Sequence, residues 1–272
     1  MNRLFAADSL QVLRQHRPII HHITNLVVMQ HCANILLALG ASPIMAHAPE
    51  EIKDIASLSQ ALVINIGTLD ETWLASMQQA QQQAHLKNMP IVFDPAGAGA
   101  STLRTSACRY FLKTGVNVLR ANASEILALY HDQFSSAGID SQHNSLEAML
   151  AGKALSTKYN CIVIISGASD LIIQQEKVVT LSHGTPLFAQ VTGMGCALGS
   201  VIAAFLATAD SDYFSACLHA VACFTIAGEI AEKKSCGPGS FQMQFLDALS
   251  NLSHTDLNQL NLKEITCSIG CN

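Results

Sequence analysis

Short, mostly apolar runs alternate with longer amphipathic segments through the first two thirds of the chain, and this alternation constrains the fold more than any other feature. The runs lack the regular exchange of apolar and polar residues that is typical of strands with one face in water. Such runs indicate strands buried on both faces of a mainly parallel sheet. The expected strands are Pro18–Ile23, Ser42–Ala46, Ala61–Gly67, Pro90–Asp94, Gly115–Leu119 and Cys161–Ser166.

Helical patterns fill the spaces between these strands, and several carry end signals. Asp70 is a typical N-cap residue, and Gly40 and Gly115 follow expected helix ends. The order of strand, helix, strand and helix predicts an α/β fold: a three-layer α/β/α domain with a mainly parallel central sheet and right-handed crossovers. The expected helices are Leu26–Leu39, Glu50–Ser59, Asp70–Leu86, Ser101–Thr114 and Ala123–His131.

The last third of the chain has a different pattern. Leu171–Gln174 and Val178–Ser182 are separated by too few residues for a crossover helix, so we expect an antiparallel hairpin at the edge of the sheet. Leu187–Val191 is expected to add a further edge strand. No linker interrupts the pattern, so we predict a single domain over residues 1–272. The remaining expected helices are Cys196–Ala209, Tyr213–Lys233 and Ser240–Leu252.

Charged residues make up 13% of the chain, against roughly 25% in an average globular domain, and the formal net charge is −5. No charged residue occurs in residues 19–49 or 181–209. Both stretches contain polar residues, Pro or Gly where a membrane span needs about 20 apolar residues, so we predict a cytoplasmic protein without a membrane span or signal peptide. We attribute the low charge to surface buried in an oligomer. The acidic balance argues against a nucleic-acid partner.

Chemically unusual residues follow several expected strands, at the edge where ligands bind in open α/β sheets. Asp94 precedes a Pro/Gly turn and could cap that turn or bind Mg²⁺. Arg120 follows another strand and suits phosphate oxygens. Glu125 could close a capping box with Asn122 or share a metal ion with Asp94. Ser166 offers a hydroxyl to a nucleotide or to a plain turn.

The segment Thr-Gly-Met-Gly-Cys at 192–196 leads into a helix of small residues. Its glycines could leave N–H groups free at a helix N-terminus, which makes an anion site, or could form only a tight turn. His21 and His22 point to opposite faces of a strand, so they cannot easily chelate one metal ion. Asn25 is the better candidate there, as a donor and acceptor for a substrate hydroxyl. An anion site, an arginine and two carboxylates at one sheet edge are what phosphoryl transfer needs.

Six segments carry a more specific pattern, in order along nearly the whole chain. They are residues 18–25, 34–47, 65–69 (Asn-Ile-Gly-Thr-Leu), 94–99 (Asp-Pro-Ala-Gly-Ala-Gly), 120–125 (Arg-Ala-Asn-Ala-Ser-Glu) and 192–196. This pattern resembles the hydroxyethylthiazole kinase family of the ribokinase-like group. Gly-Ala-Ser-Pro-Ile-Met at 40–45 and Thr-Gly-x-Gly-Cys at 192–196 are specific to that family within the group.

The resemblance implies a ribokinase-like kinase domain and ATP-dependent phosphorylation of the hydroxyl of 4-methyl-5-(2-hydroxyethyl)thiazole, a step of thiamine salvage. It also implies Mg²⁺ as the cofactor and a homotrimer with active sites between subunits. Ser166 departs from the family, which usually has Thr there, but the hydroxyl is retained. By the resemblance, the substrate contacts are Met45 and Gly193 with Asn25 and Gly67 as neighbours, the ATP contacts are Arg120 and Ser166, and the magnesium-associated acids are Asp94 and Glu125.

Cys196 stands where many ribokinase-like enzymes carry an aspartate base. Beside a helix N-terminus, we expect the pKa of this thiol to fall below its free value of about 8.5. Phosphoryl transfer passes through a loose transition state in which positioning contributes more than proton removal. The hypothesis is therefore that Cys196 chiefly orients the substrate hydroxyl and receives its proton late.

Two alternatives remain open at this stage. A kinase for another vitamin precursor, such as hydroxymethylpyrimidine or pyridoxal, would carry an aspartate at Cys196 and lack the 42–45 pattern. A nucleotide-binding sensor without turnover would not need the set of Asp94, Arg120 and Glu125.

Overall fold

The structure is a computed structural model that describes residues 5–131, 141–257 and 262–265. Its strands are β1 (Ile19–Ile23), β2 (Ser42–Ile44), β3 (Ala61–Asn65), β4 (Ile91–Asp94), β5 (Val118–Asn122), β6 (Ile162–Ser166), β7 (Asp170–Gln174), β8 (Lys177–Leu181) and β9 (Leu262–Ile265). Over the described residues they form one nine-stranded sheet in the order β2-β1-β3-β4-β5-β6-β7-β8-β9. Strands β1 to β6 are parallel, and β7, β8 and β9 continue the sheet in antiparallel pairing.

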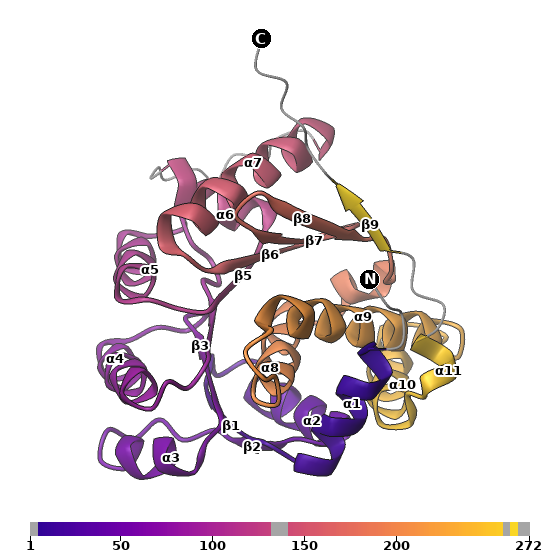
Figure 1. Ribbon diagram of the computed structural model, residues 1–272, viewed down its shortest axis with the longest axis horizontal. Helices are drawn as coiled ribbons and strands as arrows, with labels where there is room; N and C mark the ends of the chain where they lie inside the picture. Colours follow the sequence, from indigo (N-terminus) through magenta and orange to yellow (C-terminus); the bar gives the residue numbers. More distant parts are fainter. Residues whose placement is uncertain (1–4, 132–140, 258–261, 266–272) are drawn as a thin grey trace.

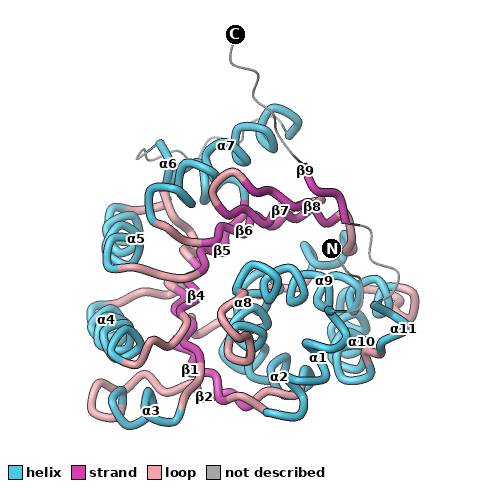
Figure 2. The backbone as a smooth tube through the Cα atoms, in the orientation of Figure 1, coloured by secondary structure: helices cyan, strands magenta, loops and turns pink. Residues whose placement is uncertain are grey.

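Helices cover both faces of this sheet (Figures 1 and 2). They are α1 (Phe5–His16), α2 (Met29–Leu39), α3 (Ile52–Leu58), α4 (Glu71–Leu86), α5 (Thr102–Thr114), α6 (Ala123–His131), α7 (Ser141–Tyr159), α8 (Met194–Leu206), α9 (Tyr213–Glu232), α10 (Pro238–Asn251) and α11 (His254–Leu257). Helices α3 to α7 lie on one face, and α8 and α9 pack on the other with α1, α2, α10 and α11 around them. The predicted three-layer α/β/α architecture is confirmed.

The central strands face two hydrophobic cores. Val92 of β4 packs in the core beneath α8, whereas the next residue, Phe93, packs in the core beneath α4 and α5. Val63 and Ile64 of β3 divide between the same two cores. Because successive side chains of a strand point to opposite faces, a strand covered on both sides needs apolar residues at every position. This explains the unbroken apolar runs of the sequence.

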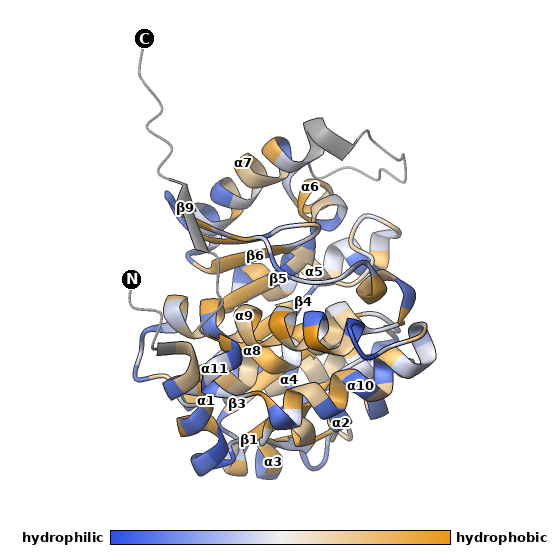
Figure 3. Cartoon of the chain, turned by 90° about the vertical axis from the view of Figure 1, so that its right-hand side faces the viewer, coloured by the Kyte–Doolittle hydropathy of each residue, from blue (hydrophilic) through white to orange (hydrophobic). Residues whose placement is uncertain are grey.

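Helix α8 accounts for much of the charge-free stretch 181–209. Nearly all of its residues are buried, and Figure 3 shows α8 and α9 mostly in the hydrophobic colours. Helix α9 is long and apolar enough, by length and composition, to cross a membrane, but 78% of its most apolar window is buried within the protein. Both helices therefore have the composition of core helices.

Several end signals act as predicted. The Asp70 carboxylate accepts a hydrogen bond from the Trp73 N–H at 2.8 Å, which caps α4. Gly40 ends α2 in the left-handed conformation, with a φ of 109°. The hairpin of β7 and β8 is also confirmed.

The prediction of an edge strand at Leu187–Val191 is wrong. Pro186–Gln190 forms a 3₁₀ helix, started by Thr185, whose hydroxyl accepts from the Leu187 N–H at 3.2 Å. The Phe188 ring packs 5.1 Å from the ring of Phe224, which holds the segment against α9. The edge position is taken by β9, so the hairpin does not form the edge of the sheet.

Some boundaries also differ from expectation. Strand β5 begins at Val118, three residues late, because Gly115 still caps α5 with a φ of 104°. Helix α2 begins at Met29, which leaves Leu26 and Val27 in an exposed turn. Helices α1, α7 and α11 and strand β9 were not predicted.

Candidate active site

The carboxyl ends of β1, β3, β4, β5 and β6 meet at one edge of the sheet because these strands are parallel. Asn65 of β3 pairs in register with Asp94 of β4, and Asn122 of β5 pairs with Ser166 of β6. The start of α8 reaches the same edge, where Cys196 contacts Asn25. The structure thus brings together eight predicted site residues from the ends of five strands and the starts of α6 and α8. They are Asn25, Gly67, Asp94, Arg120, Glu125, Ser166, Gly193 and Cys196.

Arg120 links two of these residues. Its Nη1 donates to Asp94 Oδ2 at 3.4 Å, and its Nη2 donates to Ser166 Oγ at 2.5 Å. Gly195 makes room for the guanidinium, since a Cβ at that position would lie 2.6 Å from both Nη atoms. The buried Nε has no partner among the described residues. The guanidinium therefore retains a donor for an anionic ligand.

Asp94 is 1% exposed, and burial raises the pKa of its carboxyl. Arg120 opposes this shift, and the negative charge of Glu125 adds to it. Glu125 also closes the predicted capping box: its Oε2 accepts from the Asn122 N–H at 2.9 Å, while Asn122 Oδ1 accepts from the Glu125 N–H at 2.9 Å. Its other oxygen accepts from the Gly97 N–H at 2.9 Å. Glu125 could therefore both cap the helix start and bind a metal ion with Asp94, because a capping carboxylate keeps further lone pairs.

The two carboxylates fit a magnesium ion in their chemistry. Mg²⁺ prefers oxygen ligands and is typically held by one or two carboxylates together with waters and substrate phosphates. Among the described residues, no group of three or more His, Cys, Asp or Glu side chains could hold an ion alone. Burial is the main cause of the raised pKa of Asp94, and a bound cation would favour the carboxylate form of this buried group.

Gly193 starts α8 in a conformation that favours glycine. Its φ is 88°, and a Cβ there would lie 2.4 Å from Cγ1 of Val28. The first helical hydrogen bond runs from the Ala197 N–H to the Gly193 carbonyl. The N–H groups of residues 194–196 precede that bond, so they have no helical acceptor. This arrangement agrees with the predicted anion site at the helix start.

Two asparagine amides connect the strand ends to Cys196. Asn25 Nδ2 donates to Asn65 Oδ1 at 2.9 Å and lies 3.5 Å from Cys196 Sγ. Asn65 Oδ1 also accepts from the Gly67 N–H at 2.9 Å. Asn65 did not figure among the predicted site residues, although it is the residue that joins Asn25 and Gly67.

The expectation of a lowered pKa at Cys196 is wrong. Burial, followed by the negative charge of Asp94, raises the pKa of this thiol to about 11. Arg120 and the amides of Asn65 and Asn25 act in the opposite direction, but their effects are smaller. Cys196 is therefore a neutral thiol at pH 7, because removal from water disfavours the thiolate more than its neighbours favour it.

Arg104 is a site residue that the sequence pattern did not reveal. Its guanidinium donates to three backbone carbonyls, of Ile66 at 2.9 Å, Ala96 at 2.5 Å and Gly67 at 2.6 Å. It thereby ties the loop after β3 to the loop after β4. Position 104 lies in the first turn of helix α5 and not directly after a strand, so no strand-end motif marks it.

The remaining candidates lie around this group. Met45 follows the edge strand β2 and is half-buried against the core that contains α8. His21 Nε2 lies 2.9 Å from the Ala46 carbonyl, whereas His22 Nδ1 lies 3.2 Å from Ser200 Oγ of α8. The two histidines thus contact different elements, as expected of neighbours on a strand.

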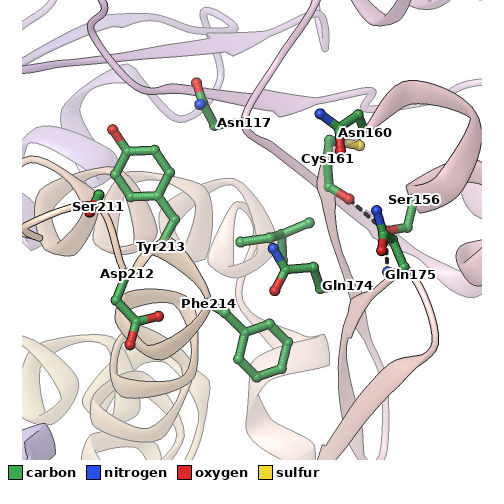
Figure 4. A pocket seen from close by; sticks show the side chains of 11 residues that line it. Asn117, Ser156, Asn160, Cys161, Gln174, Gln175, Ser211, Asp212, Tyr213 and Phe214 are labelled. Atoms are coloured by element: carbon green, nitrogen blue, oxygen red, sulfur yellow. Dashed lines mark hydrogen bonds between the residues drawn. The ribbon is translucent and has the colours of Figure 1, made fainter.

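A cavity of about 230 Å³ lies at the opposite edge of the sheet (Figure 4). Asn117 and Cys161, which precede β5 and β6, line it together with Tyr213 at the start of α9. It is separated from the candidate active site by the length of the strands. We therefore do not assign the substrate to it.

The family to which the chain belongs is shown by its sequence. The pattern that defines the hydroxyethylthiazole kinase family matches residues 10–255. The chain belongs to this family. A hydroxyethylthiazole kinase of Desulfotalea psychrophila is 44% identical over 257 residues, which cover 94% of both chains. One of Leptospira biflexa is 44% identical over 258 residues, which cover 94% of this chain and 96% of the relative.

Solved structures agree with this assignment to the hydroxyethylthiazole kinase family. The structure of the hydroxyethylthiazole kinase protein from Pyrococcus horikoshii OT3 superimposes with a TM-score of 0.89 at 36% identity, covering 96% of this chain and 99% of that one. A pyridoxal kinase from Staphylococcus aureus has a TM-score of 0.64 at 16% identity, which shows a shared fold. The fold is ribokinase-like, and membership of the family makes the chain a kinase that uses ATP and a small-molecule acceptor.

Proposed function

We propose that this chain transfers the γ-phosphoryl group of ATP to the primary hydroxyl of 4-methyl-5-(2-hydroxyethyl)thiazole, in thiamine salvage. The observation that carries the proposal is the convergence of Arg120, the start of α8 and Asp94 beside Cys196 at one sheet edge. Charge neutralisation and positioning are what a loose phosphoryl-transfer transition state needs. Membership of the family specifies the acceptor alcohol.

Arg120 and Ser166 would bind the ATP phosphates. Arg120 holds its charge at a fixed place, because Asp94 and Ser166 engage both of its Nη atoms. The N–H groups at the start of α8 would face the transferred phosphoryl oxygens. Asp94 and Glu125 would hold Mg²⁺, which neutralises phosphate charge when it is bound.

The thiazole would lie beside Asn25, Gly67 and Gly193, with the apolar surface of Met45 near its ring. A neutral, largely apolar heterocycle needs few charges around it, and the segment 19–49 carries none. The Cys196 thiol would orient the hydroxyl. The hypothesis that Cys196 also receives the proton does not fit a thiol that is already protonated, because its sulfur is a very weak base. The hydroxyl proton would instead leave late, to an oxygen of the phosphoryl group, as the new O–P bond forms and the bond to ADP breaks.

We also propose a cytoplasmic homotrimer with active sites between subunits. Leu26 and Val27, directly after Asn25, are 66% and 69% exposed. Large apolar side chains beside a substrate site are typical of a surface that another chain covers. A covering subunit would also exclude water from the transferred phosphoryl group.

A coupled assay of ADP release tests the proposed reaction. We expect release with the thiazole alcohol, and far less with hydroxymethylpyrimidine or pyridoxal. Release with pyridoxal or the pyrimidine alone would reassign the acceptor. No ADP with any of the three would contradict the proposal of a kinase for these alcohols.

A further inference from the structure

The amide of Asn65, at the end of β3, is 1% exposed and is held in one orientation. Its Oδ1 accepts hydrogen bonds from the Gly67 N–H and from Asn25 Nδ2, each at 2.9 Å. A backbone N–H can only donate, so the atom that it faces must be the amide oxygen. The Nδ2 group of Asn65 is therefore turned to the other side, away from Gly67.

This Nδ2 group makes no well-formed hydrogen bond within the part of the chain that the structure describes. It lies close enough to the Asp94 carboxyl and the Cys196 thiol to lower the pKa of both, but neither holds it at hydrogen-bonding geometry. A buried donor without an acceptor is costly, and in native structures it is commonly matched by a ligand or an ordered water. Asp94 is the register partner of Asn65 on β4, and the Asn65 amide influences both the Asp94 carboxyl and the Cys196 thiol. The unused donor thus lies among the groups that would surround the reacting hydroxyl.

Asn25 differs in this respect, because the protein itself uses its whole amide. Its Oδ1 accepts from the Val27 N–H at 3.1 Å. Its Nδ2 faces Asn65 Oδ1 at 2.9 Å and Cys196 Sγ at 3.5 Å, which accounts for both hydrogens. Of the two amides at this edge, Asn65 is the one with a donor to offer.

We propose that Asn65 Nδ2 donates a hydrogen bond to the hydroxyl oxygen of the thiazole alcohol and so orients the nucleophile. The proposal deepens the proposed function and rests on it. A hydroxyl oxygen has two lone pairs. With one lone pair bound to Asn65, the other is free to attack the phosphorus, and the O–H hydrogen turns toward Cys196. Asn25 then acts as a positioning residue that holds the Asn65 amide in place.

A pair of ligands that differ only in the hydroxyl tests this contact. The thiazole alcohol and 5-ethyl-4-methylthiazole share the ring, so damage to the pocket weakens both equally. We expect wild-type protein to bind the alcohol on the order of tenfold more tightly, the value of one good hydrogen bond. In Asn65→Ala the ratio of the affinity for the alcohol to the affinity for 5-ethyl-4-methylthiazole should fall to about one. Turnover with the alcohol should drop at least tenfold in kcat while the KM for ATP stays unchanged.

Asn117 offers a matched control at the opposite edge of the sheet. Its Oδ1 also accepts from a backbone N–H, that of Ile91 at 2.8 Å. We expect Asn117→Ala to keep the wild-type preference for the alcohol. If Asn65→Ala does not fold, Asn65→Ser serves instead, because its shorter hydroxyl cannot reach the place of Nδ2.

The outcomes separate this proposal from the proposed function. Equal loss of affinity for both ligands in the Asn65 variants, or an unchanged preference, overturns the contact while wild-type turnover stands. A rise in the KM for ATP at unchanged kcat would place Asn65 with the nucleotide and would also overturn it. Absence of turnover by wild-type protein would overturn the proposed function and this contact together.

Discussion

Cys196 lies where a helix start and a buried carboxylate act on one thiol in opposite directions. Burial, followed by the charge of Asp94, disfavours the thiolate, whereas Arg120 and two amides favour it less strongly, so the pKa rises to about 11. A helix N-terminus lowers the pKa of an exposed thiol, because the thiolate there keeps its hydration. A buried thiolate loses that hydration, and this loss raises the pKa.

The raised pKa predicts slow alkylation of Cys196. We expect its rate with iodoacetamide to rise about tenfold per pH unit from pH 7 to pH 10, because the thiolate is the nucleophile. Mass spectrometry of the labelled peptides measures this, with the exposed Cys236 as an internal comparison. A rate for Cys196 that levels off below pH 8 would contradict the raised pKa.

The variant Cys196→Asp should retain or improve turnover. An aspartate at this place supplies a base that the neutral thiol does not, and it keeps a polar group near the hydroxyl. The measurement is kcat with the thiazole alcohol, together with the affinity for that alcohol. Complete inactivity with intact substrate binding would contradict the orienting role of Cys196.

Helix α5 contributes to the site from a distance through Arg104. The arginine donates to carbonyls of the loops after β3 and β4, which carry Gly67 and follow Asp94. The Ile66 N–H also donates to the Asp94 carbonyl at 3.3 Å, and Arg104 adds three hydrogen bonds from a third element to this connection between the loops.

We expect Arg104→Gln to lose about 1–3 kcal/mol of unfolding free energy and to lower kcat/KM about 10- to 100-fold, because an amide cannot bridge three carbonyls. Urea denaturation and steady-state kinetics measure the two effects. Lys113→Gln, on the exposed face of the same helix, is the control and should change neither. A loss of stability with unchanged kcat/KM would assign Arg104 to folding alone.

Helices α1 and α9 are joined by Ser9 Oγ and His219 Nδ1 at 2.9 Å. Burial lowers the pKa of His219 to about 4. Between pH 6.5 and 4 the unfolded chain therefore binds a proton that the folded chain does not, so His219 costs stability as pH falls.

The variant His219→Asn removes this dependence. The difference in unfolding free energy between wild type and variant should change in favour of the variant by up to about 1.4 kcal/mol per pH unit as pH falls from 6.5 to 4. Urea denaturation at several pH values measures it, and other titrating groups cancel in the difference. The exposed His16 gives a control, His16→Asn. A difference that stays constant with pH would show that His219 is protonated in the folded state.

Some of the exposed large apolar residues of the folded chain lie at the active-site edge of the sheet. Leu26 and Val27 are exposed there, whereas the charge-free helix α8 is buried. The buried helix α8 needs no polar face, which accounts for part of the low charge of the sequence. The proposed trimer would account for a further part by covering the active-site edge.

The proposed trimer predicts a mass in solution of about three times the 29.1 kDa of one chain. Light scattering coupled to size exclusion measures it. Val27→Glu should dissociate the assembly and lower activity, because a charge cannot be buried unpaired at an interface. Leu86→Glu alters a leucine that is 78% exposed, against 69% for Val27, at the other end of the strands, and it should leave the mass unchanged. A monomeric wild type would contradict the trimer.

The sequence alone was sufficient for the layered fold and for most of the site. Strand β4 is an example. Every residue of Ile91–Asp94 is buried, and the burial of successive positions gives the unbroken apolar run that predicts a strand. Glu125 and Ser166 were found for a related reason, since parallel strands bring their ends to one edge. The 3₁₀ helix at Pro186–Gln190 and strand β9 were not predicted. The first depends on the contact of Phe188 with Phe224, and the second on pairing with β8, so neither follows from the local sequence pattern.

Only the tertiary structure decided the chemistry of the groups within the site. The pKa of Cys196, the free donor of Asn65 and the role of Arg104 each depend on which side chains from other elements lie within hydrogen-bonding distance and on how much water remains. A sequence fixes the order of residues along one line. Burial and electrostatic interaction depend on distances in three dimensions, which exist only once the strands, loops and helices have packed together.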